Sequence, residues 1–268
     1  LLQAALLAAA FFVLSIALTC AAAYPLLRRR FAALPPNWRA NLLFGWAALP
    51  LAGTMALLLL SFAPSLLTWA GLAPDHCHLH PDHPHLCLLH PPHIEGGMLL
   101  VTGALAGIAA MVTYLAGWVL DCWRTRRMVA NLMRLSRRDE AHGMHVVAVD
   151  APLAFAAGLR TPELFVSRHL LAQLTPAQLA IVIAHERAHA ARQDTLRHMI
   201  AALVSRLHAP TLRRCLLADL SLAAEQACDE RAAAEAGGRL AVADAILSVE
   251  KLFARWMAAG TTPRELQA

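Results

Sequence analysis

The stretch LTPAQLAIVIAHERAH, residues 174–189, predicts a helix with a sharp start and two histidines on one face. Thr175 is placed as the N-cap, Pro176 suits the first helical position, and Gln178 completes a capping box. No Gly or Pro occurs between residues 177 and 208, which supports a helix over the motif.

The H-E-x-x-H pattern within this helix is typical of a metal site. Residues four apart share a helix face, so His185 and His189 can bind one ion while Glu186 lies beside them. Zinc bound by three protein ligands keeps a further position open for chemistry. Glu186 is then the expected base that takes a proton from the attacking water and passes it to the leaving amine.

The third ligand is expected from the next long helix. Glu225 is the preferred candidate, and Glu230 and Glu235 are the alternatives. Asp194 and Asp229 are expected to orient the histidines, because metal-bound imidazoles usually donate their other ring N–H to a carboxylate. The motif alone arises by chance in unrelated proteins, but here the cap, the apolar turn before it and the later Glu-x-x-x-Asp pattern agree.

The composition indicates a membrane protein. Of the 268 residues 58% are hydrophobic and 15% charged, and the mean hydropathy is +0.50. Three apolar runs, 1–23, 41–63 and 98–120, are each long enough to cross a bilayer as a helix. A cleaved signal peptide is the alternative for the first run, but a clear cleavage site is lacking and three arginines, residues 28–30, follow it.

The arginines predict the orientation. They occur between runs one and two and after run three, whereas residues 64–97 contain no Lys or Arg. By the positive-inside rule the N-terminus and the loop 64–97 lie outside and the H-E-x-x-H segment is cytoplasmic. The net charge of +5 is thereby explained without direct nucleic-acid binding.

Two domains are therefore expected: a membrane domain over 1–123 and a cytoplasmic domain over 124–268. In the second, residues 145–149 and 164–167 are predicted strands, with a third short extended piece at 154–158. Helices are expected over 210–236 and 239–260, and a fourth span near 200–222 is an alternative.

The outside loop is rich in histidine and cysteine, and a tract of this composition is typical of Zn or Cu binding. Cys77 and Cys87 are expected either to form a disulfide or to act as ligands. A solvated loop with incidental histidines and a pH sensor are the alternatives. The candidate ligands are His76, Cys77, His78, His80, His83, His85, Cys87, His90 and His93.

Four segments together resemble the BlaR/MecR family of membrane-embedded zinc metallopeptidases, which is related to the Ste24/HtpX type. They are Ala154 to Leu159, Leu164 to Ser167, the motif through Arg192-x-Asp194, and Glu225-x-x-Cys228-Asp229. The resemblance implies a mainly α integral membrane protein of the bacterial inner membrane, with a cytoplasmic α+β zincin-like (gluzincin) domain and a small edge-strand sheet. It adds Arg192 to the groups that support the ligands.

The resemblance further implies limited proteolysis in a signalling response, with the protein itself or a cytoplasmic repressor as substrate. No penicillin-binding sensor domain follows within residues 1–268, so β-lactam sensing is not expected. The His-rich loop is instead expected to report periplasmic metal or to occupy the place of the sensor domain. The substrate is expected to add as a strand beside Leu164, Phe165, Val166 and Ser167. Membrane lipid is a further expected partner and oligomers are possible. The alternatives are a non-enzymatic metal-binding receptor or transporter, and a quality-control membrane protease.

Overall fold

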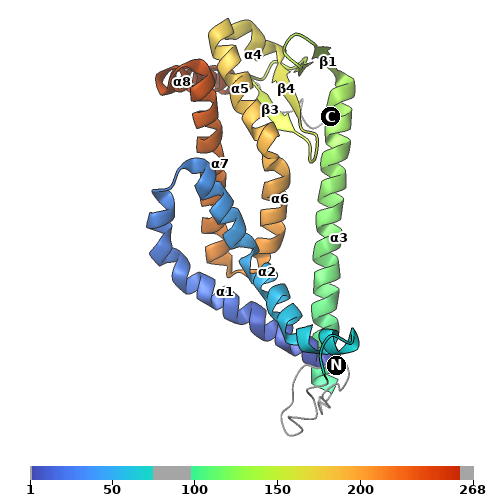
Figure 1. Cartoon of the computed structure of the whole chain (residues 1–268). Coiled ribbons are helices and arrows are strands. Elements are labelled where there is room, and N and C mark those ends of the chain that lie inside the picture. Colours follow the sequence, from blue (N-terminus) through green and yellow to red (C-terminus); the bar gives the residue numbers. More distant parts are fainter. Residues whose placement is uncertain (1, 75–97, 260–268) are drawn as a thin grey trace. The chain divides into compact units, whose positions relative to one another are not determined.

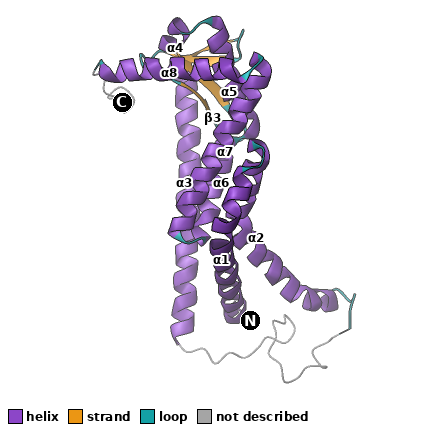
Figure 2. Ribbon diagram, turned by 90° about the vertical axis from the view of Figure 1, so that its left-hand side faces the viewer, coloured by secondary structure: helices purple, strands orange, loops and turns teal. Residues whose placement is uncertain are grey.

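The structure is a computed structural model that describes residues 2–74 and 98–259, and most of them are helical (Figure 2). All the predicted ligands of the His-rich loop lie outside the described residues. The chain forms two compact units that interleave along the sequence. The first contains most of α1, α2 and α3 and the segment Ala201–Leu217, and the second contains the remainder. The units therefore cut across the expected division at residue 123, which stays a prediction.

Three long helices supply most of the first unit. These are α1 (Leu2–Ala32), α2 (Pro36–Trp69) and α3 (Met98–Leu135), and each is long and apolar enough to cross a membrane (Figure 1). All three extend beyond the apolar runs, and in α1 and α3 the extension contains arginines, which also favour helix. The segment near 200–222, considered as a fourth span, lies in α6 (Asp194–Val204) and α7 (Pro210–Ala236), which are not among the three candidates.

A proline inside α2 requires a partner from elsewhere in the first unit. Pro50 has no N–H, so the carbonyl of Trp46 lacks its normal bond one turn along. The buried imidazole of His208, directly after the 3-10 turn η2 (Ser205–Leu207), supplies a donor, with Nε2 3.1 Å from the Trp46 oxygen. His208 therefore supplies the hydrogen bond to the Trp46 carbonyl that Pro50 cannot give.

The second unit contains a four-stranded sheet in the order β1-β2-β4-β3. The strands are β1 (Ser136–Asp139), β2 (Met144–Val147), β3 (Ala154–Ala157) and β4 (Glu163–Ser167). β4 pairs parallel with β2 and antiparallel with β3, and β1 is antiparallel to β2. The prediction missed β1 because its sequence, SRRD, is polar and lacks apolar alternation.

The predicted substrate edge is wrong. β4 lies inside the sheet, so Leu164 to Ser167 have strands on both sides and offer no free edge. Leu164, Phe165 and Val166 are buried, as expected for a continuous apolar run in a central strand. Ser167 instead caps α4 (Arg168–Gln173), accepting a bond from the Leu170 N–H. The free edge next to β4 belongs to β3.

Helices contribute to two separate hydrophobic clusters on this sheet. The core contains Met144, Leu164 and Val166 from the strands and Ile183 from α5 (Pro176–Arg192). α5 also packs against α7 and α8 (Arg239–Ala258), where Ile181 and Ala184 meet Ala232, Val242 and Ala245. On the opposite face Phe165 packs with Val129 and Leu132 of α3 and stacks on Phe155, with ring centroids 5.4 Å apart.

α5 ends after Arg192, although no Gly or Pro occurs there. Gln193 adopts a left-handed conformation with φ of 53°, and α6 begins at Asp194. The Gln193 side chain donates to the Arg160 carbonyl at 2.9 Å, a contact between segments that helix periodicity does not reveal.

Candidate metal centre

α5 begins with the predicted N-cap, Thr175, and the predicted first helical residue, Pro176. Thr175 accepts a bond from the Gln178 N–H, and the Gln178 side chain accepts from the Thr175 N–H, which completes the capping box. The Gln178 amide also donates to Asp244 and Ser248 on α8, at 2.9 Å each. The helix therefore has a fixed beginning, and His185 and His189 follow the Thr175 cap after about three and four turns.

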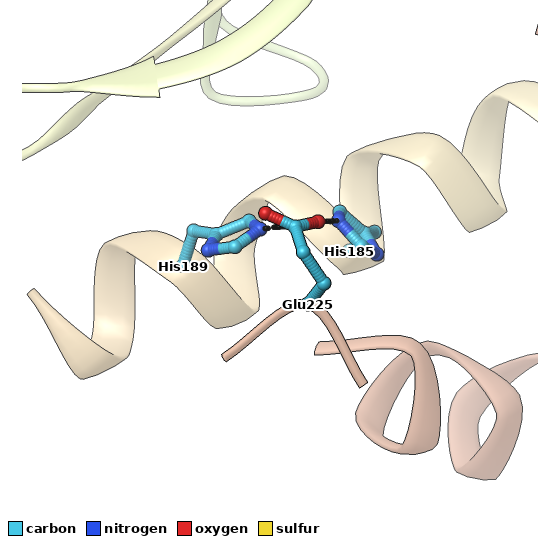
Figure 3. A group of neighbouring side chains, drawn as sticks. All are labelled: His185, His189 and Glu225. Atoms are coloured by element: carbon cyan, nitrogen blue, oxygen red, sulfur yellow. Dashed lines mark hydrogen bonds and ion pairs between the residues drawn. The ribbon is translucent and has the colours of Figure 1, made fainter. Parts of the chain in front are cut away.

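Both histidines direct Nε2 to one point, and α7 brings Glu225 to the same point (Figure 3). The two Nε2 atoms are 3.1 Å apart, and each is 3.5 Å from Oε2 of Glu225. Glu230 and Glu235, the alternative third ligands, instead form ion pairs with Arg239 and Arg231.

The three atoms fit a single metal ion. A triangle with these sides leaves all three atoms within reach of one ion at bond lengths of about 2.0–2.2 Å, as zinc requires. Two imidazole nitrogens 3.1 Å apart cannot both donate to each other, so a shared cation is a natural partner for their lone pairs. The Glu225 side chain is 54% exposed, so one side of the metal position is open to solvent.

The remaining ring nitrogens face carboxylates. His189 Nδ1 is 2.9 Å from Asp194, and His185 Nδ1 is 2.9 Å from Asp229. These contacts assign the proton to Nδ1 and leave Nε2 of each ring available to a metal. Arg192 Nε lies 3.2 Å from Asp194, so the predicted supporting residues are all close to the two histidines.

The break at Gln193 explains how Asp194 reaches His189. In a continuous helix these residues would lie five apart and off the shared face, whereas the left-handed residue turns the chain so that Asp194 faces back. Asp194 is buried, and the Cys228 thiol, also buried, lies 3.7 Å from its carboxylate. Cys228 appeared in the motif, but its contact with Asp194 was not foreseen.

Glu186 lies between the metal-site helix and the sheet. Its carboxylate accepts a bond of 2.9 Å from the Ala156 N–H on β3. Burial raises the pKa of Glu186, and the neighbouring histidines only partly oppose this. A carboxylate with a raised pKa is suited to take up a proton near neutral pH.

The ionisation of the three donors follows from their contacts. Burial lowers the pKa of His189, but the bonds to Asp194, Cys228 and Glu225 outweigh it and raise the value to about 12. Burial also lowers the pKa of His185, but its bond to Glu225 and the charges of Glu186 and Asp229 together outweigh burial, so this pKa is raised as well. The same histidines hold the pKa of Glu225 well below its usual range. Without metal, both rings therefore bind a proton more readily than a free imidazole does, because acid groups surround them.

The fold and the donor set together define the class of protein, that of H-E-x-x-H metallopeptidases. The chain belongs to peptidase family M48, whose family model matches residues 123–268. The apolar helices and the family together indicate a membrane member of it.

One similar relative is a "Protease HtpX homolog" of Acidiphilium cryptum (strain JF-5). It is 30% identical over 168 residues, which cover 49% of this chain and 58% of the relative. The chain thus spans somewhat more than half the length of this curated relative. No solved structure matches the chain.

Proposed function

We propose that this chain is a membrane-embedded zinc endopeptidase, with His185, His189 and Glu225 as the ligands and Glu186 as the catalytic base. The observation that carries the proposal is the convergence of three donor atoms within 4.8 Å, with a fourth, non-donor carboxylate beside them. A zinc ion held there supplies Lewis acidity toward a peptide carbonyl and toward water.

Residues of the chain perform the remaining steps. Glu186 accepts the proton of the attacking water and delivers it to the amine that leaves. The Ala156 N–H holds Glu186 in place, while Asp194 and Asp229 fix the orientation of the two imidazoles. Each role depends on a contact within hydrogen-bond distance.

We propose that the substrate pairs with the edge of β3 instead of β4. Phe155 is the register partner of Phe165, and the Ala156 N–H points away from β4 toward Glu186. The outer edge of β3 therefore runs beside the candidate base, and an extended peptide added there would pass the metal site.

The proposed setting is the bacterial inner membrane, with three spans, the N-terminus outside and the metal site cytoplasmic. The Arg-containing segments on either side of an Arg-free loop support this orientation. The domain division near residue 123, zinc or copper in the His-rich loop, and metal as a signal belong to the same proposal and rest on sequence.

The proposed biological role is limited proteolysis in signalling, as the BlaR/MecR resemblance implies, with a cytoplasmic repressor or the chain itself as substrate. Membrane quality control is the second candidate, and the similarity to a protease HtpX homolog favours it. Mass spectrometry of new peptide termini in cells with active chain or Glu186→Gln separates the two. One or two discrete cleavages support signalling, whereas many cleavages in misfolded membrane proteins support quality control.

A further inference from the structure

The first turns of α2 belong to the same compact unit as the metal site. Residues 34–41 are part of the second unit, although the rest of α2 is in the first. In this segment Asn37 and Arg39 each contact a helix that carries metal donors. The sequence offered no signal for this, because the contacts join residues more than 150 positions apart.

Asn37 contacts α5 through Arg192. The Asn37 side-chain oxygen accepts a bond from Arg192 Nη1. Nε of the same guanidinium lies 3.3 and 3.2 Å from the two carboxylate oxygens of Asp194, and Asp194 lies 2.9 Å from His189 Nδ1. A continuous series of polar contacts therefore connects Asn37 to a metal donor.

Arg39 contacts the other donor helix. Its Nη2 donates to the side-chain oxygen of Gln226, the residue next to Glu225 on α7. One short segment thus contacts both α5 and α7 beside their metal-binding residues.

The guanidinium makes this connection stiff. It is planar and presents its donors in a fixed fork, so holding one arm also sets the direction of the other. Side chains of Arg192 and Asp194 are only 14% and 7% exposed, which limits the alternative positions open to them. Without Asn37, Arg192 loses one of the contacts that fix its plane, and the Asp194 carboxylate loses a fixed neighbour.

We infer that Asn37 is a positioning residue of the metal centre, acting on His189 through Arg192 and Asp194. The inference rests on the proposed function, since it assumes that His189 binds zinc. Groups that orient a metal ligand typically change metal affinity about 10- to 100-fold, and a residue one step further out is expected near the lower limit.

The test measures zinc affinity of the full chain in detergent by competition with a chromophoric chelator. Asn37→Ala is expected to weaken zinc binding about 5- to 10-fold. Asn37→Asp is expected to stay within about twofold, because its carboxylate also accepts a bond from Arg192. Asn41→Ala is the matched control: Asn41 lies in the same segment and accepts a bond from Arg197 at 2.6 Å. Arg197 acts on Asp194 through its charge, which Asn41→Ala leaves in place, so the zinc affinity is expected to stay within about twofold of the parent.

A double-mutant cycle tests the route. In an Arg192→Ala background, Asn37→Ala is expected to cause no further loss of zinc affinity. An unchanged affinity in Asn37→Ala, an equal loss in Asn41→Ala, or full additivity with Arg192→Ala would each overturn the inference. Unfolding temperatures of the zinc-free variants show whether a loss of affinity reflects general destabilisation.

The result is distinguishable from failure of the proposed function. If the parent chain binds one zinc that His185→Ala abolishes, the proposed site stands and a null result for Asn37 overturns only this inference. If the parent binds no zinc through His185, both are overturned.

Discussion

Glu186 differs from its neighbours in being close to the metal site without being among the three converging donors. Its carboxylate is bound to the Ala156 N–H, and its pKa is raised by burial. Replacement by Gln preserves the shape and an oxygen that can accept from Ala156, but it removes the ability to take up a proton.

Glu186→Gln is therefore expected to keep zinc and to lose peptidase activity by about 100- to 10,000-fold, the usual contribution of a general base. Elemental analysis gives the zinc content, and cleavage of an unstructured protein substrate gives the activity. His185→Ala and Glu225→Ala, by contrast, should lose zinc. Full activity in Glu186→Gln would remove Glu186 from the mechanism.

Zinc binding is expected to release protons. In the metal-free chain the pKa of His189 is raised to about 12 and that of His185 is also raised, so both rings hold a proton more readily than a free imidazole does. A metal binds only neutral imidazole, so roughly one to two protons leave per zinc and the affinity falls as the pH is lowered. Calorimetry in buffers of different ionisation enthalpy measures this number. Binding heats independent of the buffer would contradict the prediction.

At the scale of elements, the break between α5 and α6 carries a specific conformational requirement. Gln193 has φ of 53°, where a side chain branched at Cβ is strained. Gln193→Val is expected to destabilise the fold by about 1–2 kcal/mol. Gln193→Gly accepts this backbone and loses only the bond to Arg160, so it should cost less. Chemical denaturation of the two variants compares them, and equal stability would contradict the strain argument.

The contact of His208 with α2 predicts a coupling between distant positions. His208→Ala leaves the Trp46 carbonyl without this donor, at a cost of about 1–3 kcal/mol. Pro50→Ala restores an N–H one turn along, so in that background the same change should cost clearly less. Thermal unfolding of the four chains measures the coupling. Additive effects would show that the His208 imidazole and the N–H restored at position 50 do not bind the same carbonyl, that of Trp46.

The same contact predicts a dependence on pH. Burial lowers the pKa of His208, although its bonds to the α2 carbonyls partly oppose this. Because the folded chain binds the proton less readily than the unfolded one, stability falls as the pH drops below the ordinary histidine value of about 6.5. Between pH 7.5 and pH 5 the unfolding temperature should fall less in His208→Ala than in the parent. An equal fall in the two chains would show that His208 does not cause the pH dependence.

At the scale of the whole molecule, the proposed orientation can be tested with cysteines. Cys77 and Cys87 are expected to react with a membrane-impermeant maleimide in intact, reduced cells. A cysteine introduced as Arg137→Cys in the exposed part of β1 should react only after the membrane is opened. Labelling of position 137 in intact cells would reverse the proposed orientation.

Local signals in the sequence determined much of this protein. The Thr175 cap, the four-residue spacing of His185 and His189, and the long apolar runs are properties of single segments, so a few helical turns suffice to recognise them. The helix bounds of α7 followed in the same way from its flanking Pro210 and Gly237. These features predicted the two helices that carry the site.

Only the tertiary structure decided which segments meet. Glu225, Glu230 and Glu235 lie on one helix, and the rotation of α7 against α5 is what brings Glu225 to the histidines. β4 proved central and β3 the edge because strand order depends on pairing, which short apolar runs do not encode. Asn37 reaches Arg192 for the same physical reason: contacts between distant segments depend on packing of the whole unit, whereas caps and periodicity act within one segment.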